Sequence, residues 1–233
     1  MRSRPWITWR YNARDAGGIR MSASMDFPRR RFLIAAGGVL LSARGAPAQS
    51  AAEILVAAIQ DGGKVIYLRH AATNQREIDT GRLGDRAGQR NLSSDGMRQA
   101  GSLGRALRAL RVPLNEILAS PVFRARDTAE LAFGEGHVRV TMDLVADDYA
   151  GGELRAMIEA TRRLLRTPPG PGMNRVLVGH RTPLEMATGR MFPDDVLPEG
   201  AMAVFLPGAA PQLLGTITTE RLVLSADSRG ALS

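Results

Sequence analysis

The chain has 233 residues, of which 44% are hydrophobic and 23% charged, a balance typical of a globular protein with a sizeable core. It contains no cysteine, which excludes disulfides, a thiolate nucleophile and cysteine-ligated metal sites. The net charge of +8 suggests a nucleic-acid binder, but nine Arg and only two acidic residues lie in residues 1–48. Residues 49–233 hold 22 basic and 21 acidic residues, and this near-neutral balance argues against nucleic acid as a partner.

Residues 1–48 are predicted to be an N-terminal extension that contains an export signal. A basic cluster, Arg29-Arg30-Arg31, precedes an apolar run over 32–41, and the small residues Ala46-Pro47-Ala48 follow. This order is typical of a secretory signal peptide. The apolar run is too short to span a bilayer, so we expect no stable membrane anchor after cleavage near Ala48.

The segment Arg29-Arg30-Arg31-Phe32-Leu33 also resembles a twin-arginine signal. The expected partner of residues 25–48 is therefore the twin-arginine or Sec export machinery, and the expected location is the periplasm. The alternatives are a basic N-terminus without this role and a membrane anchor. Residues 1–24 do not fit the layout, and Met21 or Met25 is the expected start of translation.

Helices and strands alternate along residues 49–233, which are predicted to form one domain. In chain order, the pattern predicts a helix over 51–59, a strand over 64–68, a polar loop over 71–89, a helix over 94–111, a strand over 116–119, a helix over 124–133, a strand over 137–140, a helix over 153–165, a strand over 175–178, a helix over 183–188, and two late strands over 203–206 and 213–217. The alternation predicts an α/β fold, a three-layer α/β/α sandwich with a mostly parallel central sheet.

Two of the predicted strands end in histidine, at His70 and His180. In open α/β sheets, ligands bind beyond the carboxyl ends of the strands. A single histidine at such a position is more often structural. Two in matching positions, the first preceded by Arg69, favour a functional site. The third histidine, His137, has no such context and is expected at the surface.

A third strand ends at Ser120-Pro121, and Arg124 follows near the start of the next helix. Helix N-termini favour anions, and a guanidinium group adds a planar fork that suits phosphate oxygens. Taken alone, such an arginine is usually solvated. Together with Arg69, His70 and His180, it predicts a cage for a tetrahedral oxyanion.

The sequence resembles the histidine phosphatase superfamily, which includes the phosphoglycerate mutase-like enzymes. Four motifs carry the resemblance, and they occur in the family's order: Leu68-Arg69-His70-Ala71, Leu92 to Ala100, Ser120 to Ala129, and Val176 to His180. There are two departures. Ala71 stands where the family has glycine, and Arg181-Thr182 stands where the family often has Gly-Gly. Neither removes a phosphate ligand.

The resemblance implies a role for each candidate residue. His70 is the nucleophile that becomes phosphohistidine, while Arg69, Arg124 and His180 bind the phosphoryl oxygens. No metal or other cofactor is required. A general acid must protonate the leaving oxygen, and a loose match to the family favours Asp147 as a second catalytic residue. The other candidates for the acid are Asp148, Glu153 and Glu185.

The expected function is an exported phosphomonoesterase, a histidine acid phosphatase-like hydrolase. Its expected substrate is a small phosphorylated compound or an envelope sugar phosphate. A mutase is disfavoured because its substrates are cytoplasmic. One alternative is a phosphohistidine-protein phosphatase. The other is a phosphate-binding protein of the same fold that has lost turnover, which is suggested by Ala71 and by the absence of a single clear candidate for the general acid.

Overall fold

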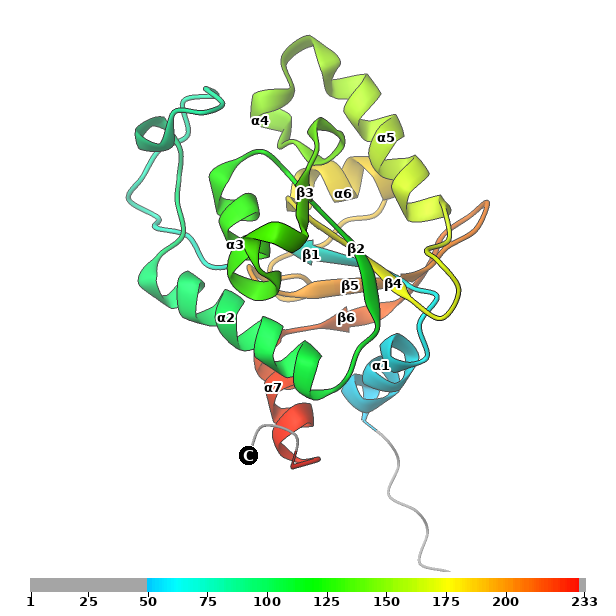
Figure 1. Ribbon diagram of the computed structural model, residues 1–233. Coiled ribbons are helices and arrows are strands. Elements are labelled where there is room, and N and C mark those ends of the chain that lie inside the picture. Colours follow the sequence, from blue (N-terminus) through cyan, green and yellow to red (C-terminus); the bar gives the residue numbers. More distant parts are fainter. Residues whose placement is uncertain (1–49, 231–233) are drawn as a thin grey trace, which may run out of the picture. The chain divides into compact units, whose positions relative to one another are not determined.

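A computed structural model describes residues 50–230 of the chain, and the predicted export signal of residues 1–48 lies outside them (Figure 1). In chain order, the helices and strands are α1 (Ala51–Gln60), β1 (Val65–Arg69), α2 (Ser94–Ala109), β2 (Leu114–Ala119), α3 (Phe123–Phe133), β3 (Val138–Val140), α4 (Asp147–Ala150), α5 (Leu154–Arg166), β4 (Asn174–Gly179), α6 (Arg181–Thr188), β5 (Met202–Leu206), β6 (Gln212–Ile217) and α7 (Thr219–Asp227). Within this range, no helix is both long enough and apolar enough to cross a membrane.

The strands form one sheet in the order β3-β2-β4-β1-β5-β6. Strands β3, β2, β4 and β1 run parallel, while β5 and β6 form an antiparallel hairpin at one edge. The predicted mostly parallel sheet is therefore confirmed. The register of β1 and β4 pairs Arg69 with Gly179, so the next residues, His70 and His180, leave neighbouring strands side by side.

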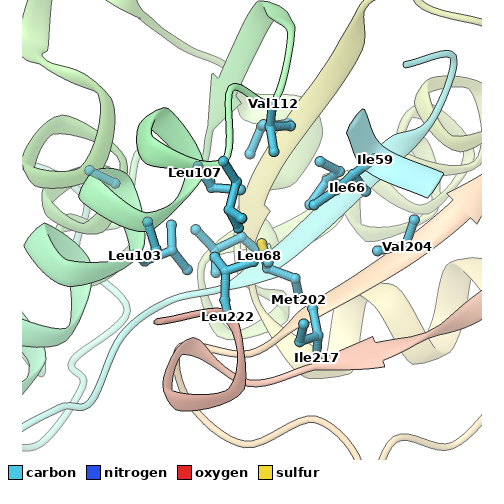
Figure 2. Packing of buried hydrophobic residues seen from close by; sticks show 14 of the residues in the cluster. Ile59, Ile66, Leu68, Leu103, Leu107, Val112, Met202, Val204, Ile217 and Leu222 are labelled. Atoms are coloured by element: carbon cyan, nitrogen blue, oxygen red, sulfur yellow. The ribbon is translucent and has the colours of Figure 1, made fainter. Parts of the chain in front are cut away.

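The alternation of side chains along each strand divides the core into two layers. On one face, Ile66 and Leu68 of β1 pack with residues of α1, α2, α3 and α7, and Figure 2 shows part of this cluster. On the other face, Val65 and Tyr67 pack with residues of α5 and α6. Each fully buried aliphatic side chain contributes about 1.5–3 kcal/mol. Helices on both faces give the predicted α/β/α sandwich.

The element boundaries differ from the predictions at particular points. The third strand begins at Val138 rather than at His137, which is exposed in a 3₁₀ turn. The predicted 183–188 helix begins two residues earlier, because Pro183 is tolerated in a first helical turn. Two helices were not predicted: α4, a single turn, and α7, whose start is capped by Thr218.

The loop between β1 and α2 is fastened immediately after His70. The Ser93 side chain caps α2 by accepting a hydrogen bond from the Gly96 amide. The Ser93 amide donates to the Ala72 carbonyl at 3.0 Å. A Cβ atom on Gly96 would lie 1.9 Å from that same carbonyl oxygen, so only glycine allows this approach. The start of α2 therefore fixes the segment that follows His70.

Candidate active site

His70 and His180 lie at the carboxyl ends of the two central strands, with their ring centroids 5.4 Å apart. Each residue is only 4% exposed. The His70 amide donates to the Gly179 carbonyl at 3.0 Å, which ties the two strand ends together. The Tyr67 hydroxyl donates to the His180 carbonyl at 2.9 Å and accepts from the His180 amide at 3.1 Å. The backbone of both histidines is thus fixed.

The surroundings of His70 leave one ring nitrogen ready to react. Its Nδ1 lies 3.0 Å from the Ala71 carbonyl oxygen, which only accepts, so Nδ1 carries the proton. Nε2 then keeps its lone pair. Burial, followed by the charge of Arg124, lowers the pKa of His70 to about 3, so the ring is neutral at neutral pH. A neutral, oriented imidazole can attack phosphorus.

His180 is held by Ser120. Ser120 Oγ accepts from the Val122 amide at 3.2 Å and lies 2.9 Å from His180 Nε2. When the Ser120 hydroxyl donates to Nε2, the proton of the neutral ring is on Nδ1. That atom is buried and has no hydrogen-bond partner. Burial and the Arg124 charge lower the pKa of His180 well below its usual value. The His180 ring is therefore neutral at neutral pH.

Arg69 and Arg124 are both buried beside these rings, each anchored at one corner of its guanidinium group. Arg69 Nη1 donates to Asp194 Oδ1 at 2.5 Å and to the Leu197 carbonyl at 2.8 Å. Arg124 Nη1 donates to Asp79 Oδ1 and Oδ2 at 3.0 and 3.1 Å. The Nε atom of each is buried without a partner.

Four buried side-chain nitrogens of the described residues lack a hydrogen-bond partner, and the three that belong to arginines are N–H donors. They are Arg69 Nε, Arg90 Nε, Arg124 Nε and His180 Nδ1. Each unpaired buried donor costs about 1–3 kcal/mol. The charges of the three arginines all lower the pKa of both histidines, so all three guanidinium groups are close to the rings. This arrangement fits an anion that accepts from several sides at once.

Arg90 was missed by the sequence predictions. It lies in the loop before α2, and its amide donates to Asp79 Oδ1 at 2.9 Å. Its side chain lines an open, polar cavity of about 550 Å³ together with Arg69 and Arg181. Arg181 pairs with Asp194 at 2.7 Å. The only sequence signal for Arg90 is its place two residues before the Leu92-Ser93 motif.

Asp147 lies in the first turn of α4 and is partly buried. Burial, followed by the charge of Asp148, raises the pKa of its carboxyl group. The charge of Arg124 acts in the opposite direction, which places Asp147 within electrostatic range of the cage. A carboxyl with a raised pKa suits a general acid.

The other three candidates for the acid have different surroundings. Asp148 and Glu153 are exposed, and Glu185 accepts a hydrogen bond from the Phe192 amide at 2.7 Å. Among the described residues, no group of three or more His, Asp and Glu side chains is arranged to hold a metal ion. The structure thus brings Arg69, His70, Arg124 and His180 together and places Asp147 nearby.

The part of the chain that contains Arg69, His70, Arg124 and Asp147 matches a known family. The histidine phosphatase superfamily (branch 1) matches residues 65–165. No match was found among curated proteins.

Several solved structures resemble the chain. The protein histidine phosphatase SixA, complexed with tungstate, is 15% identical, with 68% of this chain and 99% of that chain covered and a TM-score of 0.49. A phosphoserine phosphatase from Entamoeba histolytica is 15% identical, with 68% and 98% covered and a TM-score of 0.47. A mycobacterial glucosyl-3-phosphoglycerate phosphatase is 20% identical, with 65% and 96% covered and a TM-score of 0.43.

Proposed function

Because the chain belongs to the histidine phosphatase superfamily, we propose that it is a phosphomonoesterase whose His70 carries the phosphoryl group as phosphohistidine. The observation that carries this proposal is the set of three buried arginine N–H donors without acceptors beside two neutral imidazoles. A phosphoryl group supplies acceptor oxygens for these donors. Its negative charge also offsets the positive charge of three guanidinium groups, which lower the pKa of both rings.

In the first step, the lone pair of His70 Nε2 attacks phosphorus and the bond from phosphorus to the ester oxygen breaks. Arg69, Arg124 and His180 donate to the phosphoryl oxygens, whose charge they stabilise through the transition state. Asp147 gives its proton to the departing oxygen, so the leaving group departs as a neutral alcohol. The products are phosphohistidine, the alcohol and an ionised Asp147.

In the second step, water attacks the phosphorus of phosphohistidine while Asp147 takes a proton from that water. The N–P bond breaks and its electron pair returns to His70 Nε2. Inorganic phosphate leaves, and Asp147 is again protonated. The hydrogen bond from His70 Nδ1 to the Ala71 carbonyl holds the ring in one orientation through both steps.

The test is hydrolysis of an aryl phosphate between pH 5 and 7 by the wild-type protein, His70→Ala and His137→Ala. His137 is the matched control because it is exposed and lies before the start of β3, not at the carboxyl end of a strand. We expect His70→Ala to abolish turnover and His137→Ala to keep it. Brief exposure to a ³²P-labelled phosphomonoester should label wild type at His70 as an acid-labile adduct. A wild type as inactive as His70→Ala on a broad panel of phosphomonoesters would refute the proposal.

We further infer that the protein acts after export, on a hydrophilic substrate such as a small phosphorylated compound or an envelope sugar phosphate. The basic and apolar order of residues 29–48 supports export, and the polar, arginine-lined cavity beside the site supports a hydrophilic leaving group. Changing Arg29, Arg30 and Arg31 to Lys should retain the protein in the cytoplasm if the twin-arginine route is used. N-terminal sequencing of periplasmic protein should begin near residue 49, and a cytoplasmic, uncleaved product would contradict export.

A further inference from the structure

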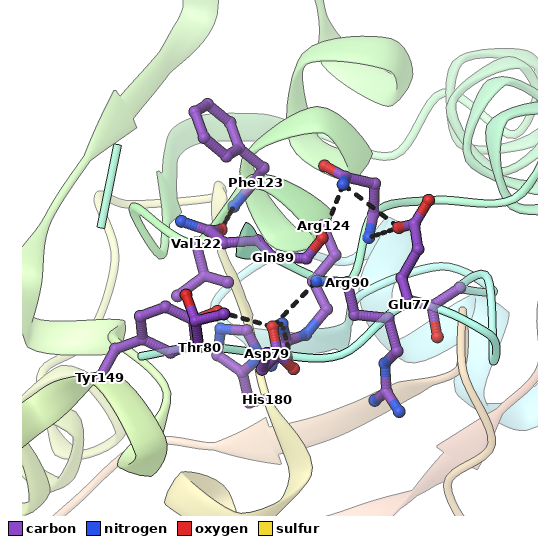
Figure 3. A network of polar contacts seen from close by, with 12 residues as sticks. Glu77, Asp79, Thr80, Gln89, Arg90, Val122, Phe123, Arg124, Tyr149 and His180 are labelled. Atoms are coloured by element: carbon purple, nitrogen blue, oxygen red, sulfur yellow. Dashed lines mark hydrogen bonds and ion pairs between the residues drawn. The ribbon is translucent and has the colours of Figure 1, made fainter. Parts of the chain in front are cut away.

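We propose that Asp79 is a positioning residue that aims the guanidinium groups of Arg124 and Arg90 at the phosphoryl group. This inference rests on the proposed function and adds to it a residue that the sequence motifs did not indicate. Asp79 lies in the loop between β1 and α2, nine residues after His70 and outside all four motifs. Figure 3 shows it between Arg124, Arg90 and Tyr149.

The carboxylate of Asp79 joins three segments of the chain. Oδ1 accepts from Arg124 Nη1 of α3 at 3.0 Å, from the Tyr149 hydroxyl of α4 at 2.6 Å and from the Arg90 amide at 2.9 Å. Oδ2 accepts from Arg124 Nη1 at 3.1 Å. Although burial acts to raise the pKa of Asp79, the donors from Tyr149, Arg90 and Arg124 lower it overall. Asp79 therefore stays ionised and accepts from all of them.

The contact with Arg124 uses only one corner of the guanidinium group. Nη1 is held by Asp79, whereas Nε is buried without a partner. The Nε–Nη2 edge is the side of the planar group that binds two oxygens of one anion. Fixing Nη1 at one corner sets the direction of this edge. Asp79 also supplies a negative charge that a buried arginine needs when no phosphate is bound.

Arg90 is positioned through its backbone. No hydrogen bond or ion pair of the described residues holds its side chain, and its Nε is buried without a partner. The bond from its amide to Asp79 is the contact that places its Cα beside the cage. One carboxylate thus aligns two of the three unpaired arginine donors without occupying either Nε.

A neighbouring ion pair provides the matched control. Arg86 and Asp127 also join this loop to α3, through hydrogen bonds of 2.6 and 2.9 Å, and neither touches the cage. If Asp79 acts only by fastening the loop, then Asp127→Asn should have the same effect as Asp79→Asn. If Asp79 aims the donors, only Asp79 variants should weaken anion binding.

The experiment measures binding of inorganic phosphate by calorimetry at pH 7, together with KM and kcat for an aryl phosphate. The proteins are full-length wild type, Asp79→Asn, Asp79→Ala, Tyr149→Phe and Asp127→Asn. Losing a charge-assisted hydrogen bond should weaken phosphate binding roughly 10- to 100-fold in Asp79→Ala. Asp79→Asn keeps an acceptor and should lose less, and Tyr149→Phe should lose least. KM should rise more than kcat falls, and Asp127→Asn should bind like wild type.

Three results would overturn the inference. Tighter phosphate binding by Asp79→Asn would show that Asp79 competes with the anion. Equal losses of phosphate binding in Asp79→Asn and Asp127→Asn would show that Asp79 only fastens the loop. Unchanged phosphate binding in the Asp79 variants would show that Asp79 has no role. Should Asp79→Ala not fold, Asp79→Asn and Tyr149→Phe decide between these results. Phosphate binding does not require turnover, so a wild type that binds phosphate but hydrolyses no ester would refute the proposed function alone.

Discussion

At the residue scale, the site depends on two histidines that stay neutral beside three cations. Burial and the arginine charges lower both pKa values, and the Ala71 carbonyl keeps the His70 proton on Nδ1. His70 Nε2 therefore offers a lone pair, while Ser120 holds the second ring through its Nε2. The same environment has a consequence for folding, because both rings regain an ordinary pKa in the unfolded chain.

The stability of the protein should fall in mild acid. The folded pKa of His70 is about 3 and its unfolded value is 6.5, so the unfolded chain binds more protons between these pH values. The stabilisation is complete above about pH 6.5 and decreases as the pH falls, by up to about 1.4 kcal/mol per pH unit for each buried histidine. Urea unfolding from pH 8 to pH 4 measures this slope. His70→Asn should have a shallower slope than wild type, and an equal slope would contradict the assignment.

Asp147→Asn should discriminate between substrates by their leaving groups. A poor leaving group such as an alkoxide needs a proton, so alkyl phosphate turnover should fall about 10²- to 10⁴-fold, whereas nitrophenyl phosphate turnover should fall much less. The raised pKa of Asp147 keeps the acid protonated at low pH, so wild-type activity on alkyl phosphates should be lost as the pH rises through that pKa. Glu153→Gln is the exposed control. Equal effects of Asp147→Asn on both substrates would show that another group is the general acid.

At the element scale, the start of α2 determines where the chain can go after His70. Gly96 of α2 lies against the Ala72 carbonyl, and Gly104 further along α2 lies equally close to the Ala132 carbonyl of α3. These two approaches set the distance between α2 and its neighbours. Sequence periodicity predicts α2 itself. It gives no information about where the missing side chain of a glycine allows another segment to pack closely.

Gly96→Ala should therefore destabilise the protein and lower its activity. The added methyl group would overlap a backbone oxygen that cannot rotate away, at a cost of about 1–3 kcal/mol. Gly101→Ala is the control in the same helix, since its nearest atom is the flexible end of Arg105 at 3.4 Å. That substitution should be neutral or stabilise by about 0.5–1 kcal/mol, because glycine is a poor helix former. Thermal unfolding and turnover measure both, and equal effects would contradict the packing argument.

The sequence predicted the helices and strands whose pattern lies within a few neighbouring residues. Buried strands such as Val65–Arg69 have short apolar runs, and α2 has a cap and a regular apolar face. The two histidines could be placed because parallel strands share one carboxyl edge. Arg90 and Asp79 could not be placed, because a loop without periodicity follows a path that its contacts with α3 and α4 determine. Helix α4 is too short to show a period.

At the scale of the whole molecule, the reacting groups come from segments that only the complete fold brings together. Arg69 and Gly179 pair across β1 and β4, although they are separated by more than a hundred residues of sequence. Ser120, at the end of β2, supports His180 from the other side. The cage therefore cannot form until three central strands have paired.

Amide hydrogen exchange should be slower in the central strands than in the edge strands. Amides of β1 and β4, which have a strand on each side, should exchange only on global unfolding, whereas β3 and β6 at the sheet edges should exchange earlier through local opening. Mass spectrometry of peptides spanning residues 65–69 and 174–179 measures the slow class. Faster exchange there than in residues 212–217 would contradict the expectation.

The three-residue length of β3 has a further consequence. An outer strand this short offers few free backbone groups to a foreign chain, so that side of the protein is a poor template for intermolecular pairing. Fraying at that edge should leave catalysis intact, since the nucleophile follows β1, three strands further in. The loss of turnover on heating should then follow global unfolding of the protein rather than local unfolding of the edge strand.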